Sequence, residues 1–432
     1  MWCVGNARGG RYIFAPFVIS FLFANIKMLT VEEALSTILQ QVSVADAEVR
    51  SLTDSLNYVL AEDLVTPHDS PPFDKSMMDG FAVNSMAFVG NDSVTLQVQE
   101  TITAGNVPSL SVTDRSVSRI MTGAVIPDGA DCVVPIEATE FDEQHPDTVN
   151  VRSSVVSGGR NILRQGVAAR KDTPLMKAGT RLEPQHIAVL AEFGMAKVPV
   201  HRRSTVAVLA TGDELLAIDQ PLSPGRIRNS NEPMLVSQVR RANADPVALG
   251  VARDTREDLR KHIRDGLKSD FLLLSGGVSA GTLDLVPSEL AAAGVEQVFH
   301  KLQMKPGKPL WFGELRSDDH RCWVFGLPGN PVSSMICFEL FVRSALRKAG
   351  GQRDPLPEYH SAVLTEEVTV RGDRVTYFPA RLHMANGSLL ASPVPWGGSA
   401  DLRSTADANG MCVLHPSDKP YVAGDTVPAA KW

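Results

Sequence analysis

The residues best suited to chemistry in this chain lie in short loops that each follow an apolar run. Residues 275–281 read SGGVSAG and come directly after the apolar run 271–274. Glycines at such a turn let backbone amides approach a phosphate, and a helix that begins there adds a favourable dipole. A simple tight turn is the alternative explanation of the glycines alone. Asp284 favours the phosphate site, because a carboxylate beside bound phosphate usually holds a metal or orients a nucleophile.

Two further acids follow other apolar runs of the chain. Glu214 comes shortly after the run 206–210, and Asp254 comes shortly after the run 247–251. Each acid taken singly is more simply explained as a helix cap or a surface charge. Acids from several loops that converge at one edge of a sheet instead indicate a site for Mg²⁺ or for an oxyanion. We therefore predict Glu214, Asp254 and Asp284 as metal ligands.

A group of lysines supplies positive charge near these acids. Residues 301–309 read KLQMKPGKP, so Lys301, Lys305 and Lys308 share one segment that prolines stiffen. A solvated basic loop is the alternative. Because the whole chain has a net charge of −7, a rigid lysine triplet is better explained as a receptor for an anion.

Two other loops have unusual compositions and no periodicity. Residues 73–82 read FDKSMMDGFA, in which Asp74 and Asp79 flank a Ser-Met-Met core. Residues 121–124 read MTGA and place the hydroxyl of Thr122 beside a glycine. Taken alone, both loops are explained as structural turns. Nothing in their spacing shows that they lie near the other loops.

The glycine turn, the acids and the lysine segment all lie between residues 200 and 348, in a part of the chain with regular alternation. Helical segments such as 234–242 and 256–267 alternate there with four apolar runs, at 206–210, 247–251, 271–274 and 323–325. This alternation predicts an α/β domain with a doubly wound parallel sheet. Ligands of such sheets bind at the carboxyl ends of the strands, which is where all four following loops fall.

The rest of the chain divides into smaller units. We expect helices over residues 31–42 and 56–64, with Thr30 and Glu33 as a capping box, and a helix over 183–193 closed by Gly194. Short β segments are expected at residues 94–98, 116–120, 132–136 and 148–151. The predicted domains are a discontinuous helical linker domain (28–66 and 159–196), a β domain (67–158), an α/β domain (197–350) and a C-terminal β domain (351–432).

Composition argues against several classes of protein. A chain of 432 residues with 44% hydrophobic and 21% charged residues is typical of a soluble protein with several domains. Its negative net charge argues against general nucleic-acid binding. Scattered cysteines without a C-x-x-C pair favour a reducing cytoplasm over a disulfide framework or a zinc site, and they are Cys3, Cys132, Cys322, Cys337 and Cys412.

The N-terminal segment needs its own explanation. An apolar run over residues 12–26 follows two arginines and superficially resembles a signal-peptide core, but its cleavage pattern is weak. The run is shorter than the roughly 20 residues that a membrane-spanning helix needs. Met28 offers a second start directly before the first predicted helix. We expect residues 1–27 to be an extension without a folded role, and the protein to be cytoplasmic and to make no membrane contact.

Taken together, these loops resemble those of the bacterial MoeA family, whose relatives include the E domain of gephyrin and its plant counterpart. The resemblance covers roughly Met28 to the C-terminus, and it is specific because several motifs occur in the same order. The matching segments are PFDKSMMDGFA (72–82), MTGA (121–124), TGDEL (211–215), SGGVSAGTLD (275–284), KPGKP (305–309) and GLPGNP (326–331).

The resemblance implies a molybdenum insertase, which puts molybdate into adenylated molybdopterin (molybdopterin-AMP) and releases AMP in a Mg²⁺-dependent reaction. This reaction is the last step of molybdenum-cofactor synthesis. The implied architecture is an elongated homodimer of four-domain subunits with a central α/β domain of the molybdopterin-binding type. The active site lies between the α/β domain of one subunit and the β domain of the other. The molybdopterin adenylyltransferase and molybdoenzyme apoproteins are expected as further partners.

The resemblance also assigns roles to individual residues. It implies catalytic roles for Asp79, Thr122, Glu214, Asp254 and Asp284. Together with the glycine-rich loop, it places substrate binding on Ser275, Gly276, Gly277, Ser279, Gly281, Lys301, Lys305, Lys308, Pro328 and Pro331. Mg²⁺ and lysines would offset the repulsion between molybdate and the phosphoanhydride, and a threonine would position an oxyanion.

The chain departs from the family pattern at two places. Residues 164–171 read RQGVAARK where family members commonly read Arg-x-x-Gly-Glu-Asp, so Ala168 replaces a functionally implicated acid. Asn229 stands where an acid is frequent. Two alternatives stay open. The lost acid allows a catalytically impaired paralogue that binds molybdopterin or acts as a scaffold. A molybdopterin adenylyltransferase is the other alternative, because that class shares a related α/β domain with a Gly-Gly-Val-Ser-type loop. The motifs at 72–82 and 326–331 favour an insertase over an adenylyltransferase, which is normally one small domain.

Overall fold

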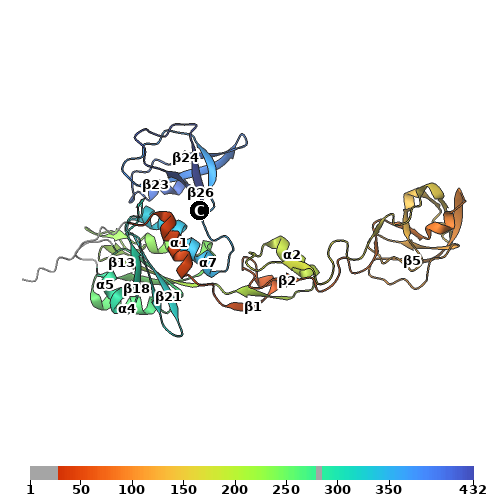
Figure 1. Cartoon of the computed structure of the whole chain (residues 1–432), viewed down its shortest axis with the longest axis horizontal. Helices are drawn as coiled ribbons and strands as arrows, with labels where there is room; N and C mark the ends of the chain where they lie inside the picture. The colour runs from red at the N-terminus through yellow and green to blue at the C-terminus, as the bar shows by residue number, and fades with distance from the viewer. Residues whose placement is uncertain (1–27, 279–284) are drawn as a thin grey trace, which may run out of the picture.

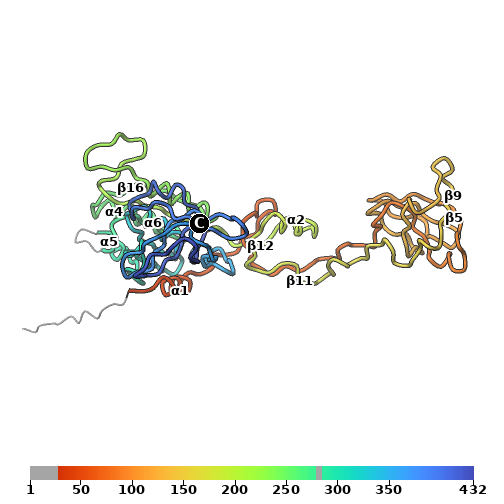
Figure 2. Tube along the Cα trace, turned by 90° about the horizontal axis from the view of Figure 1, so that it is seen from above, coloured from red at the N-terminus to blue at the C-terminus, as the bar shows by residue number. Residues whose placement is uncertain are grey.

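The computed structural model describes residues 28–278 and 285–432, which form an elongated molecule (Figure 1). The α/β domain and the C-terminal domain lie side by side at one end. An arm, made of the folded linker domain and the thin chain segments beyond it, leads from them to the β domain at the other end, and the view from above shows the same separation (Figure 2). The multidomain architecture predicted from the sequence is therefore confirmed.

The α/β domain is built on a six-stranded sheet in the order β16-β13-β17-β21-β20-β18. Its first four strands are parallel to one another, and they are β16 (Asp245–Ala252), β13 (Thr205–Thr211), β17 (Phe271–Ser275) and β21 (Arg321–Leu327). This core confirms the predicted parallel sheet. Antiparallel pairings, which we did not predict, extend it through β20 (Trp311–Arg316) and β18 (Glu296–His300).

Successive residues of the central strands point into two separate hydrophobic cores, as a doubly wound sheet requires. On one face, Val206 and Val208 of β13 pack in a core with α3 (Asn231–Arg241) and α6 (Pro331–Cys337). On the other face, Ala207 and Leu209 pack in a core with α4 (Arg256–Gly266) and α5 (Val286–Ala292). Burial of each large aliphatic side chain contributes about 1.5–3 kcal/mol, so the sheet is a rigid support for its loops.

The first helix, α1 (Val31–Gln41), belongs with the α/β domain. Its predicted capping box is confirmed, since the Glu33 amide donates to Thr30 Oγ1 at 3.1 Å and the Thr30 amide donates to a Glu33 carboxylate oxygen at 2.8 Å. Ala34 and Ile38 are buried in the same core as η5 (Phe338–Val342) and α7 (Arg343–Ala349). The prediction that residues 28–66 form part of the linker domain is therefore wrong for this helix, because its apolar stripe is buried elsewhere.

The linker domain is mostly β structure around one helix. β1 (Ala47–Ser51) pairs with β12 (Lys197–His201), and β2 (Leu64–Val65) pairs with β11 (Pro174–Met176). The predicted helix 183–193 is confirmed as α2 (Pro184–Glu192), and Gly194 follows it with φ 72°. The predicted helix 56–64 is wrong, because this segment instead makes single bridges from Val59 and Leu60 to the opposite side of the domain.

Two antiparallel chain segments connect the linker domain to the β domain. At their crossing, the Ser70 amide donates to the Ala169 carbonyl at 2.8 Å, and the Ala168 amide donates to the Ser70 carbonyl at 3.0 Å. The β domain beyond has a six-stranded sheet in the order β7-β4-β6-β5-β9-β8. Its strands are β4 (Gly80–Val83), β5 (Ser93–Ile102), β6 (Ser116–Ile120), β7 (Cys132–Pro135), β8 (Thr139–Phe141) and β9 (Thr148–Arg152), which confirms the four predicted segments.

The C-terminal domain is a mixed six-stranded sheet that curls back on itself, because β23 pairs with both β24 and β25. Its strands are β19 (Met304–Lys305), β22 (His360–Leu364), β23 (Val375–Ala385), β24 (Ser388–Pro393), β25 (Gly410–Leu414) and β26 (Thr426–Lys431). β19 comes from the lysine-rich loop of the α/β domain, so the two domains share a sheet edge. In the described part of the chain, no helix has the length and hydropathy to cross a membrane.

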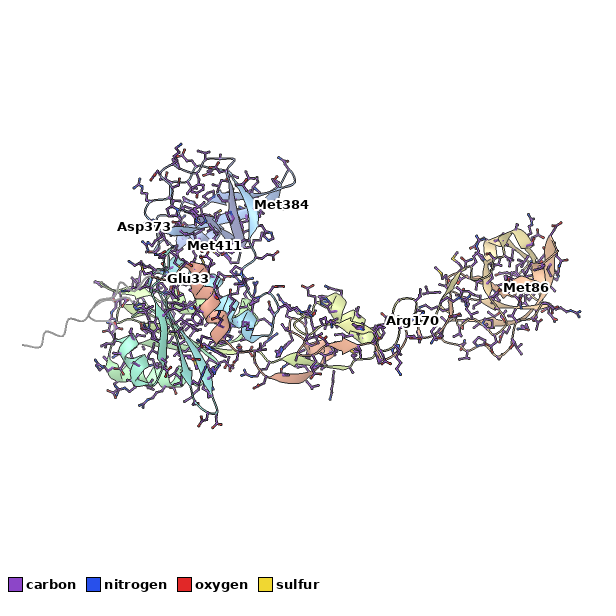
Figure 3. All side chains as sticks on the ribbon, in the orientation of Figure 1. Glu33, Met86, Arg170, Asp373, Met384 and Met411 are labelled. Atoms are coloured by element: carbon purple, nitrogen blue, oxygen red, sulfur yellow. The ribbon has the colours of Figure 1, made fainter. Side chains whose placement is uncertain are left out.

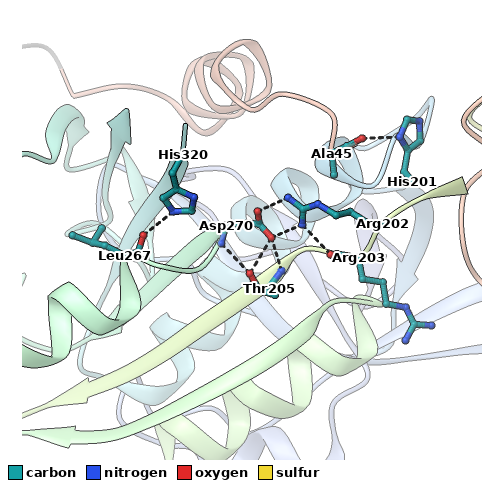
Figure 4. A network of polar contacts seen from close by, with 8 residues as sticks. All are labelled: Ala45, His201, Arg202, Arg203, Thr205, Leu267, Asp270 and His320. Carbon is teal, nitrogen blue, oxygen red and sulfur yellow. Dashed lines mark hydrogen bonds and ion pairs between the residues drawn. The ribbon is translucent and has the colours of Figure 1, made fainter. Parts of the chain in front are cut away.

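An ion pair joins the end of the arm to the α/β domain (Figure 4). Arg202, just after β12, donates to both oxygens of Asp270 at 2.7 Å, and the Thr205 amide donates to the same carboxylate at 2.7 Å. Burial by itself would raise the pKa of Asp270, but the hydrogen bonds from Arg202 and Thr205 and the guanidinium charge hold it below its ordinary value. The link between arm and sheet is therefore an ionised, hydrogen-bonded carboxylate.

Candidate functional site

The predicted loops of the α/β domain gather at one edge of its sheet. β16, β13, β17 and β21 are parallel, so the loops after all four strands leave from the same edge. β18 is antiparallel to β20, which is antiparallel to β21, so β18 also ends at this edge, directly before Lys301. The carboxyl edge therefore brings the glycine turn, the acids, the lysine segment and the proline loop into one region.

The glycine turn after β17 needs glycine for two reasons. Gly276 and Gly277 have φ angles of 100° and 64°, a region that side chains disfavour. A Cβ on Gly276 would also lie 2.7 Å from the Thr211 carbonyl oxygen, and one on Gly277 would lie 2.6 Å from Val286 Cγ2. The turn is thus packed closely against β13 and α5. The predicted residues Ser279, Gly281 and Asp284 lie outside the described residues.

The acids after β13 and β16 are held next to each other by their own backbones. The Asp213 amide donates to Asp254 Oδ2, and the Asp254 amide donates to Asp213 Oδ1, both at 3.3 Å. The side chain of Glu214 folds over Gly212, where a Cβ would lie 2.5 Å from Glu214 Oε2. Asp213 is a residue that we did not predict, although it stands beside Glu214 in the TGDEL motif.

The acids suit a hard cation. Among the described residues, no three His, Cys, Asp or Glu side chains are gathered closely enough to hold a metal ion. Glu214 and Asp254 nevertheless offer exposed carboxylate oxygens on neighbouring loops. Mg²⁺ commonly binds through one or two carboxylates and keeps several waters, so this donor set fits it. The predicted third ligand, Asp284, lies outside the described residues.

The lysine segment is a closed loop. The Lys301 amide donates to the Leu310 carbonyl at 2.9 Å, and the Leu302 amide donates to the Lys308 carbonyl at 2.8 Å. A Cβ on Gly307 would lie 2.7 Å from Cys337 Sγ, so the tip of the loop is packed onto α6. No described acid forms an ion pair with the ammonium groups of Lys301, Lys305 or Lys308 within 4.0 Å. Their charge is therefore available to an anionic ligand.

The proline loop connects the site with the C-terminal domain. Pro328 is buried directly after β21, and Pro331 is the first residue of α6. Between them, Asn330 Nδ2 donates to Ser399 Oγ at 3.0 Å, while the Val332 amide donates to the Ser399 carbonyl at 3.1 Å. We did not predict Ser399, because its segment shows no sequence feature that points to this loop.

Asp79 and Thr122 form one constellation in the β domain. Asp79 Oδ1 accepts hydrogen bonds from the Thr122 amide at 2.6 Å and from Thr122 Oγ1 at 2.8 Å. These bonds, with the charge of Arg119, hold the pKa of Asp79 below its ordinary value. Figure 3 shows how far this domain lies from the α/β sheet. Met86, in the same domain as Asp79, is labelled at one end of the molecule, and Glu33 of α1, which packs on the α/β domain, is labelled at the other. Within one chain, therefore, Asp79 and Thr122 meet each other but not the sheet edge.

The two departures from the family pattern have different surroundings. Asn229 is buried, donates through Nδ2 to Glu232 Oε2 at 2.8 Å and accepts from the Glu232 amide at 3.2 Å. An acid at this position would face the carboxylate of Glu232, which explains the asparagine. Ala168 is exposed at the crossing of the two connecting segments, where only its backbone is engaged.

Comparison with known families matches nearly the whole chain. The MoeA N-terminal region (domain I and II) matches residues 29–194, a probable molybdopterin binding domain matches residues 207–348, and the MoeA C-terminal region (domain IV) matches residues 361–432. These three matches follow the same order as the motifs on which the resemblance rested.

Individual relatives agree with this result. A molybdopterin molybdenumtransferase of Bacillus subtilis (strain 168) is 35% identical over 403 residues, which cover 92% of this chain and 93% of the relative. One of Staphylococcus aureus (strain COL) is 35% identical over 408 residues, covering 92% and 94%. The crystal structure of a molybdopterin biosynthesis MoeA protein from Pyrococcus horikosii is 28% identical and superimposes with a TM-score of 0.80 over 94% of this chain and 99% of that chain. The chain therefore belongs to the MoeA family of molybdopterin molybdenumtransferases.

Proposed function

We propose that this protein inserts molybdate into molybdopterin-AMP and releases AMP. Family membership over 92% of the chain is the observation that carries the proposal. In the reaction, water cleaves the phosphoanhydride bond between molybdopterin and AMP, so that AMP leaves, and the two thiols of the pterin replace one oxo group of molybdate, which leaves as water. This chemistry requires a site that holds two anions together while charge grows on the leaving phosphate.

The carboxyl edge of the α/β sheet offers the groups that such a site needs. Gly276 and Gly277 adopt the positive φ angles that let a tight turn present backbone amides to a bound phosphate. Lys301, Lys305 and Lys308 supply positive charge that described acids do not neutralise. A phosphoanhydride and a molybdate dianion are then held against their mutual repulsion by fixed cations rather than by water.

The acids complete this site as ligands of Mg²⁺. Glu214 and Asp254, with the predicted Asp284, would hold the ion close to the phosphates. Held by these residues, Mg²⁺ would supply positive charge beside the phosphate oxygens. The reciprocal amide contacts of Asp213 and Asp254 hold the two strand-end loops together and so keep the carboxylates in place.

A second copy of the chain supplies the remaining residues in this proposal. Asp79 and Thr122 border β4 and β6 of the β domain, which lies at the far end of the molecule from the α/β sheet, so they reach a sheet edge only when it belongs to another subunit (Figure 1). The lowered pKa of Asp79 keeps its carboxylate ionised, and Thr122 is already oriented by that carboxylate. We therefore place the reaction in a homodimer whose sites are each shared between two subunits.

The test is AMP release from molybdopterin-AMP by the purified full chain with Mg²⁺. The proposal predicts AMP release that depends on added molybdate. Substrate binding without AMP release, with and without molybdate, would contradict it. A parallel assay with sulfate in place of molybdate controls for an unspecific anion effect.

A catalytically impaired, molybdopterin-binding scaffold is the second candidate, and Ala168 is the observation that favours it. Its exposed methyl group stands at the crossing of the two connecting segments, in place of an acid that the resemblance implies. If the wild-type chain binds molybdopterin-AMP without turnover and Ala168→Asp releases AMP, the second candidate is correct. Turnover by the wild-type chain rejects it.

A further inference from the structure

The side chain of Asn231 connects two loops of the site. Asn231 is the first residue of α3, and its Nδ2 donates to Ser275 Oγ at 2.6 Å and to the Gly329 carbonyl at 2.7 Å. Ser275 ends β17 directly before the glycine turn, while Gly329 lies in the proline loop after β21. One amide group therefore fixes the spacing of the two loops that flank the proposed phosphate position.

The orientation of this amide is determined by its partners. The Gly329 carbonyl can only accept a hydrogen bond, so the atom facing it must be the nitrogen of Asn231. Asn231 Oδ1 is buried and accepts no hydrogen bond from any residue that the structure describes. A buried acceptor atom without a hydrogen bond lowers stability, so the structural role of the half-buried Asn231 side chain rests on the two hydrogen bonds that it donates.

The same geometry determines what the Ser275 hydroxyl can do. Because its oxygen accepts from Asn231 Nδ2, the hydroxyl hydrogen is left to be donated to another group. Within the described parts of the chain, Ser275 Oγ has no hydrogen bond other than this one. Ser275 is 2% exposed, so its hydroxyl hydrogen can reach only an anionic oxygen that is held directly against the glycine turn.

We propose that Asn231 is a positioning residue of the nucleotide phosphate site, which acts by keeping the Ser275 hydroxyl as a donor toward bound phosphate. The phosphate belongs to the AMP moiety, so the inference rests on the proposed function for the identity of the ligand. Asn231 itself makes no contact with the phosphate in this account. Its effect on binding passes through Ser275 and through the spacing of the Ser275 and Gly329 loops.

The substitution Asn231→Asp tests the donor directly, because it exchanges the amide nitrogen for a carboxylate oxygen of almost the same size. That oxygen would take the Ser275 hydrogen for itself and repel the Gly329 carbonyl. Asn231→Ala removes the contact without capturing the hydrogen, and it is a second variant should the first fail to fold. Asn243→Asp is a matched control, since Asn243 Nδ2 also donates to a backbone carbonyl, that of Asn57, at 2.8 Å in the linker domain.

The measurement is AMP affinity by isothermal titration calorimetry, with thermal unfolding of each variant alongside. We expect Asn231→Asp to weaken AMP binding about tenfold, the effect of one lost hydrogen bond to a charged group, and Asn231→Ala to weaken it less. Asn243→Asp should leave AMP affinity unchanged, whatever it does to stability. A folded Asn231→Asp protein with wild-type AMP affinity overturns the proposal.

A double substitution shows whether the effect passes through Ser275. In a Ser275→Ala background no hydroxyl remains to be oriented, so adding Asn231→Asp should weaken AMP binding less than about twofold further. A full tenfold further loss would assign the effect of Asn231 to another group and overturn the proposal. Failure of the insertase function is distinguishable, because a wild-type chain that binds AMP but shows no molybdate-dependent turnover contradicts that function alone.

Discussion

Replacing Asp270 by asparagine should loosen the joint between the arm and the α/β domain. The Asp270 carboxylate receives two guanidinium hydrogen bonds from Arg202, a hydrogen bond from the Thr205 amide and one from the Thr205 hydroxyl (Figure 4). Asparagine keeps one acceptor oxygen and turns the other into a donor that faces Arg202. The variant therefore loses the charge pair and gains a donor opposite a donor.

The expected loss follows from how far the pair is buried. The carboxylate side chain of Asp270 is 15% exposed, while that of Arg202 is 37% exposed. Breaking a fully buried pair costs 3–5 kcal/mol, and solvent around Arg202 screens part of this. We therefore expect the free energy of unfolding of the α/β domain to fall by about 2 kcal/mol at pH 7.

The pH dependence of this loss has a definite sign. Because the folded-state pKa of Asp270 is lowered, its contribution to stability is fully present above the unfolded-state value of about 3.9. The contribution disappears as pH falls through the folded-state pKa. The difference between wild type and Asp270→Asn should thus be constant from pH 6 to 8 and shrink below about pH 4.

Urea unfolding followed by tryptophan fluorescence measures this difference, because Trp311 and Trp323 are both buried in the α/β domain. Asp265→Asn is the matched control, since Asp265 also pairs with a cation, Lys268, but on the exposed surface of the same domain. Its unfolding midpoint should stay at the wild-type value. An Asp270→Asn protein as stable as wild type at pH 7 would show that the Arg202–Asp270 pair does not stabilise this joint.

Three further changes have defined outcomes. Gly276→Ala should lower the free energy of unfolding by about 1–3 kcal/mol and weaken AMP binding, because its Cβ would meet the Thr211 carbonyl oxygen. The control Gly424→Ala has a similar φ of 97° but open space around its Cβ, so it should leave AMP binding unchanged. Asn229→Asp should destabilise the protein more at pH 8 than at pH 5, because protonation of the new carboxyl group restores a donor toward Glu232. An equal decrease of the urea midpoint relative to wild type at both pH values would contradict this. Removing Mg²⁺ with EDTA should stop AMP release in the insertase assay, and turnover that persists without divalent cations would remove Mg²⁺ from the account.

The α/β domain could be predicted from its sequence because its signals are local. Four apolar runs followed by loops are the strands β13, β16, β17 and β21, and the intervening helices begin and end within a few residues of the predicted positions. The glycine and proline loops were recognisable because few residue types fit their backbone geometry. Asp213, by contrast, was missed, although it lies within a recognised motif, because nothing local shows that its backbone pairs with Asp254.

The errors concern contacts between segments that are distant in sequence. The helical period of α1 is visible from residue 31, but only the folded chain shows that its apolar stripe packs against α7. Residues 56–64 have helical composition, yet bridges from Val59 and Leu60 to the opposite side of the linker domain replace the helix. Ser399 joins the site only through the fold of the C-terminal domain. Tertiary pairing overrides local propensity in such places.

Mixed dimers show whether each active site combines residues of two subunits. Subunits with Asp79→Asn and subunits with Glu214→Gln are co-expressed with different tags, and dimers that carry both tags are purified. Each such dimer has one site with both residues intact and one site that lacks both, so the account predicts about half of the wild-type molybdate-dependent AMP release. Homodimers of either variant should be nearly inactive. Mixed dimers as inactive as the two homodimers would contradict the account.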